Sequence, residues 1–434
     1  MRAAVLGSSG AGLAIAWLGL GFGLAVQAGC QERNPPEANR ASATPSSTSA
    51  SASASASAAA APSASASAEP SAAGPPRVVA IAAGADHTFA VYSTGEVKGW
   101  GDNRDGELGL DKKTRAALTP TLVPNLENVV QIDGAARRSC AVLRDGTAEC
   151  WGNNFAGALG DGKTKSRATP APVDSDGPTR QVQVDWGHGC ILLRDGTVRC
   201  WGLIAQSTPS ESRPKPVKKL ASVEGLALGG DTSYAWHSDG SVSTWDLELG
   251  KQWLYAESVE GQYDNIRTSG ARVKGVDDAR ALAASSTHVC ALRRGGTLMC
   301  WGSGNRGQLG DGRFGTEYFV AKPKPVAGLE DLSCVAVGPS FTCVCHTSGQ
   351  VSCWGRNEWG QLGLGDKKGR MKPELVAGLE NITSLAVGDD HTCALSRDGF
   401  VFCWGKNMSG QIGDGEKGLP ATRLRPVRID VGAP

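Results

Sequence analysis

Ten cysteines of this 434-residue chain come in five pairs, with nine residues between the two thiols of each pair. A Trp-Gly dipeptide follows the second cysteine every time. The pairs are Cys140 with Cys150, Cys190 with Cys200, Cys290 with Cys300, Cys343 with Cys353, and Cys393 with Cys403. Paired thiols can form disulfides, bind zinc or fill space as small apolar side chains. The residues between them decide among these chemistries.

The segment between paired cysteines indicates a β-hairpin. In the first such pair, Arg144, Asp145 and Gly146 are typical of a three-residue hairpin loop whose glycine is left-handed. This register places Cys140 opposite Cys150 as a non-hydrogen-bonded pair, and the expected Cα separation of about 4.5 Å suits a disulfide. Zinc is less consistent with this spacing, which resembles none of the usual ligand patterns.

Two more copies of the hairpin lack both cysteines together. At the two cysteine positions, one copy has Phe89 and Gly99 and the other has Tyr234 and Thr244. Since bonded partners are lost in pairs, this pattern favours disulfides, although buried free thiols stay open as an alternative. Cys334 and Cys345 occur in only one unit and occur together, which predicts a sixth bridge. Bridges of this kind indicate an exported protein.

Histidine recurs two residues before the first paired position in four units. These residues are His87, His188, His288 and His391. A ring of histidines could bind a metal or act in catalysis. Arg138, Thr232 and Phe341 interrupt the ring, so we expect a structural hydrogen bond that holds the turn between strands. Without a nucleophile elbow, phosphate loop or zinc-protease motif, we expect no catalytic residue, metal or cofactor.

The elements that position these residues form a repeat of about 50 residues. The first paired positions lie at 89, 140, 190, 234, 290, 343 and 393. Each unit has an apolar strand, the cysteine hairpin, a Gly-x-Leu-Gly-like element and a Pro-rich strand. Strands that are apolar on both faces suit blades stacked in a ring. The sequence therefore predicts an all-β, seven-bladed β-propeller over residues 78–434.

The repeating order Gly-x-x-His-Thr-Cys-Ala-Leu, Asp-Gly, Trp-Gly-x-Asn and Gly-Gln-Leu-Gly resembles the regulator of chromosome condensation repeat family. The resemblance implies a seven-bladed propeller and covers about residues 78–430. Units three and four depart from it, because the Gly-x-Leu-Gly element is missing or degraded after Trp201 and Trp245. The family includes a nuclear exchange factor and a secreted β-lactamase inhibitor. The exchange activity is not expected of an exported chain.

The N-terminal segment predicts an export signal. Residues 1–29 have a basic start and an apolar, glycine-rich middle, and an Ala-Gly pair precedes Cys30. This ending resembles a bacterial lipobox, although Gln27 departs from it, and implies lipidation of Cys30. An uncleaved membrane anchor is the alternative. Residues 30–77 are rich in Ser, Ala and Pro and predict a disordered linker between the cell envelope and the propeller.

Partner binding is the function that these features favour. A formal net charge of +1 argues against nucleic acid. Large aromatics in the irregular loops are candidate anchors for a protein or glycan: Trp253, Tyr255, Tyr263, Phe314, Tyr318 and Trp359. We expect a monomeric, non-catalytic binding module in the cell envelope. A propeller lyase or hydrolase with an axial site and a structural envelope component are the alternatives.

Overall fold

Short antiparallel strands dominate the computed structural model, which describes residues 75–203, 210–230, 232–246 and 271–432. The predicted export signal, Cys30, most of the linker, Trp253, Tyr255 and Tyr263 lie outside the described residues. Over the described ranges, no helix is long and apolar enough to cross a membrane.

The described strands form seven four-stranded sheets, and each sheet follows the order of the chain. Blade 1 contains β1 (Val78–Ala83), β2 (His87–Tyr92), β3 (Val97–Asp102) and β4 (Ala116–Leu122), and blade 2 contains β5 (Val129–Ala135), β6 (Arg138–Leu143), β7 (Ala148–Gly152) and β8 (Arg167–Pro172). Blade 3 contains β9 (Thr179–Val184), β10 (His188–Leu193), β11 (Val198–Gly202) and β12 (Glu211–Pro216), and blade 4 contains β13 (Val223–Gly229), β14 (Thr232–His237), β15 (Val242–Asp246) and β16 (Ala271–Arg272). Blade 5 contains β17 (Ala279–Ala284), β18 (His288–Arg293), β19 (Leu298–Ser303) and β20 (Phe319–Pro325), and blade 6 contains β21 (Leu332–Gly338), β22 (Phe341–His346), β23 (Val351–Gly355) and β24 (Arg370–Leu375). Blade 7 contains β25 (Ile382–Val387), β26 (His391–Ser396), β27 (Val401–Gly405) and β28 (Arg423–Ile429), and single 3-10 turns occur at η1 (Phe155–Gly157) and η2 (Leu419–Ala421).

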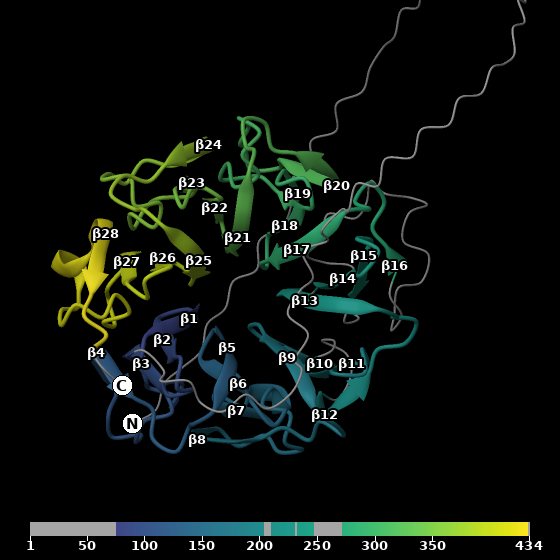
Figure 1. Cartoon of the computed structure of the whole chain (residues 1–434), viewed down its shortest axis with the longest axis vertical. Helices are drawn as coiled ribbons and strands as arrows, with labels where there is room; N and C mark the ends of the chain where they lie inside the picture. Colours follow the sequence, from purple (N-terminus) through teal and green to yellow (C-terminus); the bar gives the residue numbers. More distant parts are fainter. Residues whose placement is uncertain (1–74, 204–209, 231, 247–270, 433–434) are drawn as a thin grey trace, which may run out of the picture. The chain divides into compact units, whose positions relative to one another are not determined.

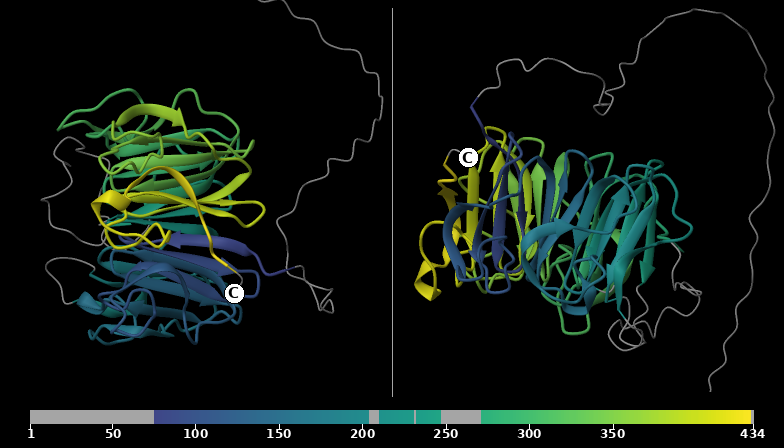
Figure 2. Two further views of the ribbon diagram at one scale, coloured as in Figure 1. Left: turned by 90° about the vertical axis from the view of Figure 1, so that its left-hand side faces the viewer. Right: turned by 90° about the horizontal axis from the view of Figure 1, so that it is seen from below.

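The blades form a closed ring around an axis, which confirms the predicted fold (Figure 1). The first strand of every blade lies innermost and contacts the first strands of both neighbouring blades, including β1 against β25. Seen edge-on, the strands run between the two ends of the ring (Figure 2). Among the described strands, no blade combines the beginning and the end of the chain, so contacts between blades 7 and 1 close the ring.

The hairpins have the register expected from the sequence. Cys140 lies opposite Cys150, the Leu143 amide donates to the Thr147 carbonyl, and Gly146 has a φ of 97°. Disulfides join the five hairpin pairs across Cα separations of 4.1 to 4.2 Å. A sixth bridge joins Cys334 on β21 to Cys345 on β22. Every bridge lies within one blade, and six bridges are typical of an oxidising, exported environment.

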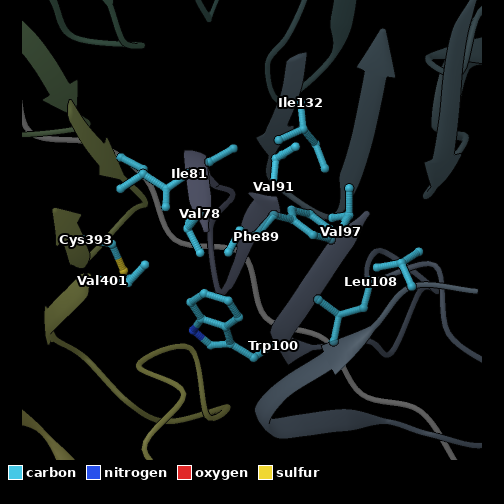
Figure 3. Close-up of a cluster of buried hydrophobic side chains, with 14 of the residues drawn as sticks. Val78, Ile81, Phe89, Val91, Val97, Trp100, Leu108, Ile132, Cys393 and Val401 are labelled. Carbon is cyan, nitrogen blue, oxygen red and sulfur yellow. The ribbon is translucent and has the colours of Figure 1, made fainter. Parts of the chain in front are cut away.

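The core fills the spaces between blades. Six tryptophans are fully buried: Trp100, Trp151, Trp201, Trp245, Trp354 and Trp404. Figure 3 shows Phe89 and Trp100 of blade 1 among side chains that include Cys393 and Val401 of blade 7 and Ile132 of blade 2. Because both faces of each blade are covered, the strands can be apolar on both sides.

Candidate partner-binding face

The recurring histidines are buried between blades. The imidazole Nε2 of His87 lies 3.0 Å from the Ser139 hydroxyl in the next blade. That hydroxyl donates to the Glu107 carbonyl at 2.8 Å, so the imidazole is its donor. The other histidines pair in the same way with the next blade: His188 with Ser233, His288 with Thr342, and His391 with Thr88. The expected bond within the turn is present in two units, where Nδ1 of His188 lies 2.8 Å from Asp185 Oδ1 and Nδ1 of His288 lies 3.3 Å from the Ser285 hydroxyl. In all four units the imidazole also bonds to the neighbouring blade, which we did not expect.

The environment of these histidines is unsuited to catalysis. Burial lowers the pKa of His87 to about 4, of His288 to about 3 and of His391 to about 4. Each is at most 1% exposed, so the neutral rings are held away from solvent. Among the described residues, no group of three or more His, Cys, Asp or Glu side chains could hold a metal ion.

The same seams use the tryptophan of the Trp-Gly motif. The Gly-x-Leu-Gly loop of the preceding blade supplies a backbone carbonyl that accepts two hydrogen bonds. One comes from the indole nitrogen of the tryptophan, and the other comes from the Ser or Thr hydroxyl on the second strand of the same blade as the tryptophan. The indole donors and their acceptors are Trp100 and Gln411, Trp151 and Glu107, Trp354 and Gln308, and Trp404 and Gln361. The Trp-Gly motif supplies the indole donor and the Gly-x-Leu-Gly motif supplies the carbonyl acceptor of a hydrogen bond between blades. The two motifs therefore recur together.

Blade 2 departs from this arrangement at the axis. Arg138 replaces the histidine, and Gly189 replaces the hydroxyl residue of the next blade. The Arg138 guanidinium donates through Nη2 to the Trp186 carbonyl at 2.9 Å, while Nε and Nη1 have no described partner. Arg138 is 2% exposed, and burial lowers its pKa to about 10. This arginine therefore supports the turn that carries Trp186.

An axial cavity of about 1140 Å³ lies inside the ring of first strands. Its walls are mostly small and apolar, with Ala82, Val184 and Leu385 among them. Asp133 is an acidic wall residue whose carboxylate accepts from the Val184 amide at 2.7 Å. Burial raises the pKa of Asp133 to about 7. The cavity thus has an apolar wall that is interrupted by polar and charged residues, among them Asp86, Gln183 and Asp389.

One end of the ring carries the mouth of this cavity. Because strands alternate in direction, the turns between first and second strands share this end with the loops that follow Trp-Gly. Residues of both kinds line the cavity, including Trp186 from a turn of blade 3 and Phe155 from a loop of blade 2. We call this end the mouth face.

Two large aromatics project from the mouth face. Trp186 is 67% exposed and Phe155 is 62% exposed. Arg137 lies beside them in the cavity lining and pairs with Asp105 at 3.2 Å. Exposed aromatics at the edge of a recess are typical anchors of protein interfaces.

An ionic network occupies the blade 7 and blade 1 side of the mouth. Lys406 lies 3.1 Å from Asp86 and 3.6 Å from Asp390, and Arg356 pairs with Asp390. Asp389 is exposed beside this network. Removal from water, followed by repulsion from Asp390 and Asp86, raises the pKa of Asp389 to about 6.

The aromatics predicted from the sequence have different environments. Phe314 is 67% exposed in the loop that follows β19. Tyr318 of the same loop donates its hydroxyl to Asp311 and is partly covered. Trp359 is half-buried, and the Lys406 ammonium lies 5.8 Å from its ring centre. The two loops that carry these aromatics belong to the mouth face, but none of the three side chains lines the cavity.

The sequence interpretation missed Trp186 and Phe155. The signal for Trp186 was its place in the repeat, where other units have Ala85, Ala136, Ser286, Pro339 and Asp389. Phe155 similarly replaces Arg104, Asn305, Glu358 and Met408. An aromatic residue at a connection position where the other units have no aromatic points to an exposed contact. Both residues lie in short connections, whereas the predicted anchors lie mainly in the longest loops.

The fold and this face define a disulfide-bonded, seven-bladed β-propeller with an open axial cavity. A family model described as the regulator of chromosome condensation (RCC1) repeat matches residues 94–142, 295–345 and 348–395. A second model with this description matches residues 78–107, 279–308, 333–361 and 382–411. The chain therefore contains regulator of chromosome condensation repeats within residues 78–142 and 279–411.

Similar proteins differ widely in size and role. The chain is 28% identical over 300 residues to the ultraviolet-B receptor UVR8 of Arabidopsis thaliana, covering 68% of this chain and 57% of UVR8. It is also 28% identical over 300 residues to the human E3 ubiquitin-protein ligase HERC2, covering 66% of this chain and 5% of HERC2. The chain thus spans less than two thirds of either relative.

A solved structure of Prp20p from Saccharomyces cerevisiae has the same fold. It superposes with a TM-score of 0.68 at 21% identity and covers 79% of this chain and 87% of Prp20p. Prp20p is described as binding Gsp1p and histones.

Proposed function

We propose that this chain is an exported, non-catalytic propeller that binds a protein partner through its mouth face. The observation that carries the proposal is the pair of exposed aromatics, Trp186 and Phe155, at the edge of the axial cavity. Burying both side chains in a complex would remove several hundred Å² of mostly apolar surface from water, since each large aromatic buries about 150–250 Å². Area of this kind stabilises an interface at its centre.

A binding role suits the chemistry of the cavity better than an enzymatic one. The four recurring histidines are engaged between blades. Asp133 is a wall carboxylate with a pKa near 7, but it accepts a backbone amide hydrogen and has no described acid or base in hydrogen-bond contact. General acid and base catalysis needs such groups positioned together around a substrate.

The location of the protein is part of the proposal. Six bridges within the propeller support export into an oxidising compartment. We propose that residues 1–29 direct export, that Cys30 carries a lipid, and that residues 30–77 link the envelope to the propeller at 78–434. In this arrangement the mouth face would meet partners at the cell envelope.

Affinity capture with matched variants tests the binding role. The immobilised chain, a Trp186→Ala/Phe155→Ala variant and a Phe400→Ala variant are each exposed to the exported proteins of the producing cells. Phe400 is 41% exposed in a hairpin turn at the opposite end of the ring and serves as the control. We expect a specific protein to be retained by the wild type and the control and lost by the double variant. Equal retention by all three, or by none, would contradict the proposal.

A further inference from the structure

The turns around the cavity mouth carry more acidic than basic side chains. The described turns between first and second strands contain four aspartates, Asp86, Asp185, Asp389 and Asp390, and one arginine, Arg137. A second arginine, Arg138, follows as the first residue of β6. What a partner would meet depends on which of these charges are already paired.

The two arginines offer little positive charge to a partner. Arg138 is 2% exposed and is directed to the Trp186 carbonyl. Arg137 is exposed but pairs with Asp105 across the neighbouring loop. A cation in a salt bridge at the surface is largely neutralised by its partner and by solvent.

Three of the aspartates are likewise engaged. Asp185 is 7% exposed and accepts hydrogen bonds from the amides of Gly187 and His188 at 3.0 Å. Asp86 pairs with Lys406 and accepts from the side-chain amide of Gln411 at 2.6 Å. The third, Asp390, pairs with Arg356.

Asp389 differs from the other three aspartates. It is exposed, it lines the cavity, and its carboxylate has no ion pair or hydrogen bond among the described residues. Its backbone amide bonds to the Ala85 carbonyl at 3.4 Å, which holds the turn in place between blades 7 and 1. Lys406 and Arg356 are near enough to favour the charged form of this carboxyl, but they pair with Asp86 and Asp390 and not with the Asp389 carboxylate.

The mouth therefore combines an apolar arc in blades 2 and 3 with an unpaired negative charge in blade 7. We propose that the partner presents a lysine or arginine next to a bulky apolar side chain, the cation reaching Asp389 and the apolar group contacting Trp186 and Phe155. This inference rests on the proposed protein-binding function and adds the chemistry of the recognised segment. Opposite charges across an interface select the partner and its orientation.

Selection from a random library of displayed dodecapeptides tests this inference. The purified full chain is the bait, and Trp186→Ala and Asp389→Asn variants are screened in parallel. Asp398→Asn is the matched control, because Asp398 is an exposed aspartate in a hairpin turn at the opposite end. Thermal unfolding of each variant establishes that the propeller remains folded.

We expect the enriched peptides to carry Lys or Arg within a few residues of Trp, Phe or Leu. Asp389→Asn should weaken their affinity at least fivefold, while Asp398→Asn should leave it unchanged. Peptides that depend on Trp186 but are acidic or uncharged, or that bind Asp389→Asn equally well, would overturn this inference alone. A selection that yields no peptide dependent on Trp186 would contradict both this inference and the proposed binding face.

Discussion

At the scale of the residue, the repeat allows each side chain to be compared with the residues at the equivalent position of the other blades. Glu107 stands where three equivalent loops have Gln308, Gln361 and Gln411 and a fourth has Ala158. Its Oε2 accepts from the Asp105 amide at 2.8 Å, as the glutamines accept from the equivalent amides. Its Oε1 is buried without a described partner. The glutamate is therefore an ionisable side chain in a buried site that holds a neutral glutamine in other blades.

We predict that Glu107→Gln stabilises the propeller increasingly as the pH rises. Burial raises the pKa of Glu107 to about 7, so the folded chain retains a proton that the unfolded chain releases above its ordinary pKa. The stability that this group contributes is complete at low pH and is lost as the pH rises through 7. At pH 8 the variant should gain about 2–3 kcal/mol, and at pH 5 much less.

Urea unfolding of both proteins at pH 5, 6, 7 and 8 measures this difference. The buried histidines and Asp133 titrate in both proteins, so comparison with the wild type removes their contribution. A difference in unfolding free energy that does not change with pH would contradict the assigned environment of Glu107.

At the scale of the element, the hairpin is the unit that the sequence predicted best. The Arg-Asp-Gly loop at Gly146 and the nine-residue spacing of the cysteines are local signals, and local signals determine hairpin register. The structure also shows why a blade can form without the bridge. In blade 1, Phe89 lies opposite Gly99, and a Cβ on this glycine would come within 2.7 Å of the phenyl ring. An aromatic opposite a small residue fills the place of the disulfide.

We predict that Cys393→Ser/Cys403→Ser lowers the unfolding free energy of the oxidised protein by about 2–3 kcal/mol, the value expected for closing a short loop. Reduction of both proteins before unfolding should remove the difference. Cys393→Phe/Cys403→Gly, which copies blade 1, should recover part of the loss. Equal urea midpoints for the oxidised wild type and the serine variant would show that the bridge does not stabilise its hairpin.

Contacts between elements were harder to predict from the sequence. The recurrence of histidine is visible in the sequence, but the partner of each imidazole Nε2 lies in the next blade, 45 to 54 residues away for three histidines and 303 residues away for His391. Arg138 replaces the histidine in blade 2 and Gly189 replaces its hydroxyl partner in blade 3. The two replacements are related only because these blades are neighbours in the ring. The candidate face was missed for a related reason, because Trp186 comes from a short turn and lies near the axis only in the closed ring.

At the scale of the whole molecule, the ring closes through side chains rather than through a shared sheet. At the seam between blades 7 and 1, the His391 imidazole pairs with the Thr88 hydroxyl at 2.9 Å. The same hydroxyl donates to the Gln411 carbonyl at 3.0 Å, and the Trp100 indole donates to this carbonyl at 3.0 Å. Trp100 packs against the apolar side chains of blade 7 (Figure 3). The seam therefore repeats the contacts found between other blades.

We predict that Thr88→Val weakens ring closure. The substitution leaves the His391 imidazole without its acceptor and the Gln411 carbonyl with one donor fewer, at a cost of about 1–3 kcal/mol. Thr179→Val is the control, because the Thr179 hydroxyl is buried without a described partner and its removal should be neutral or stabilising. Calorimetric melting of the three proteins measures the effect. Equal destabilisation by both substitutions would contradict the role of the seam.

We propose that the mouth face, rather than the opposite end, meets a protein partner. Site-specific photo-crosslinking in the producing cells distinguishes the two ends, with a photoreactive phenylalanine derivative placed at Phe155 or at Phe400. Both positions are exposed, and they lie at opposite ends of the ring. We expect a discrete adduct with one protein from position 155 and none from position 400. Adducts from position 400 alone, or the same adducts from both positions, would contradict the proposal.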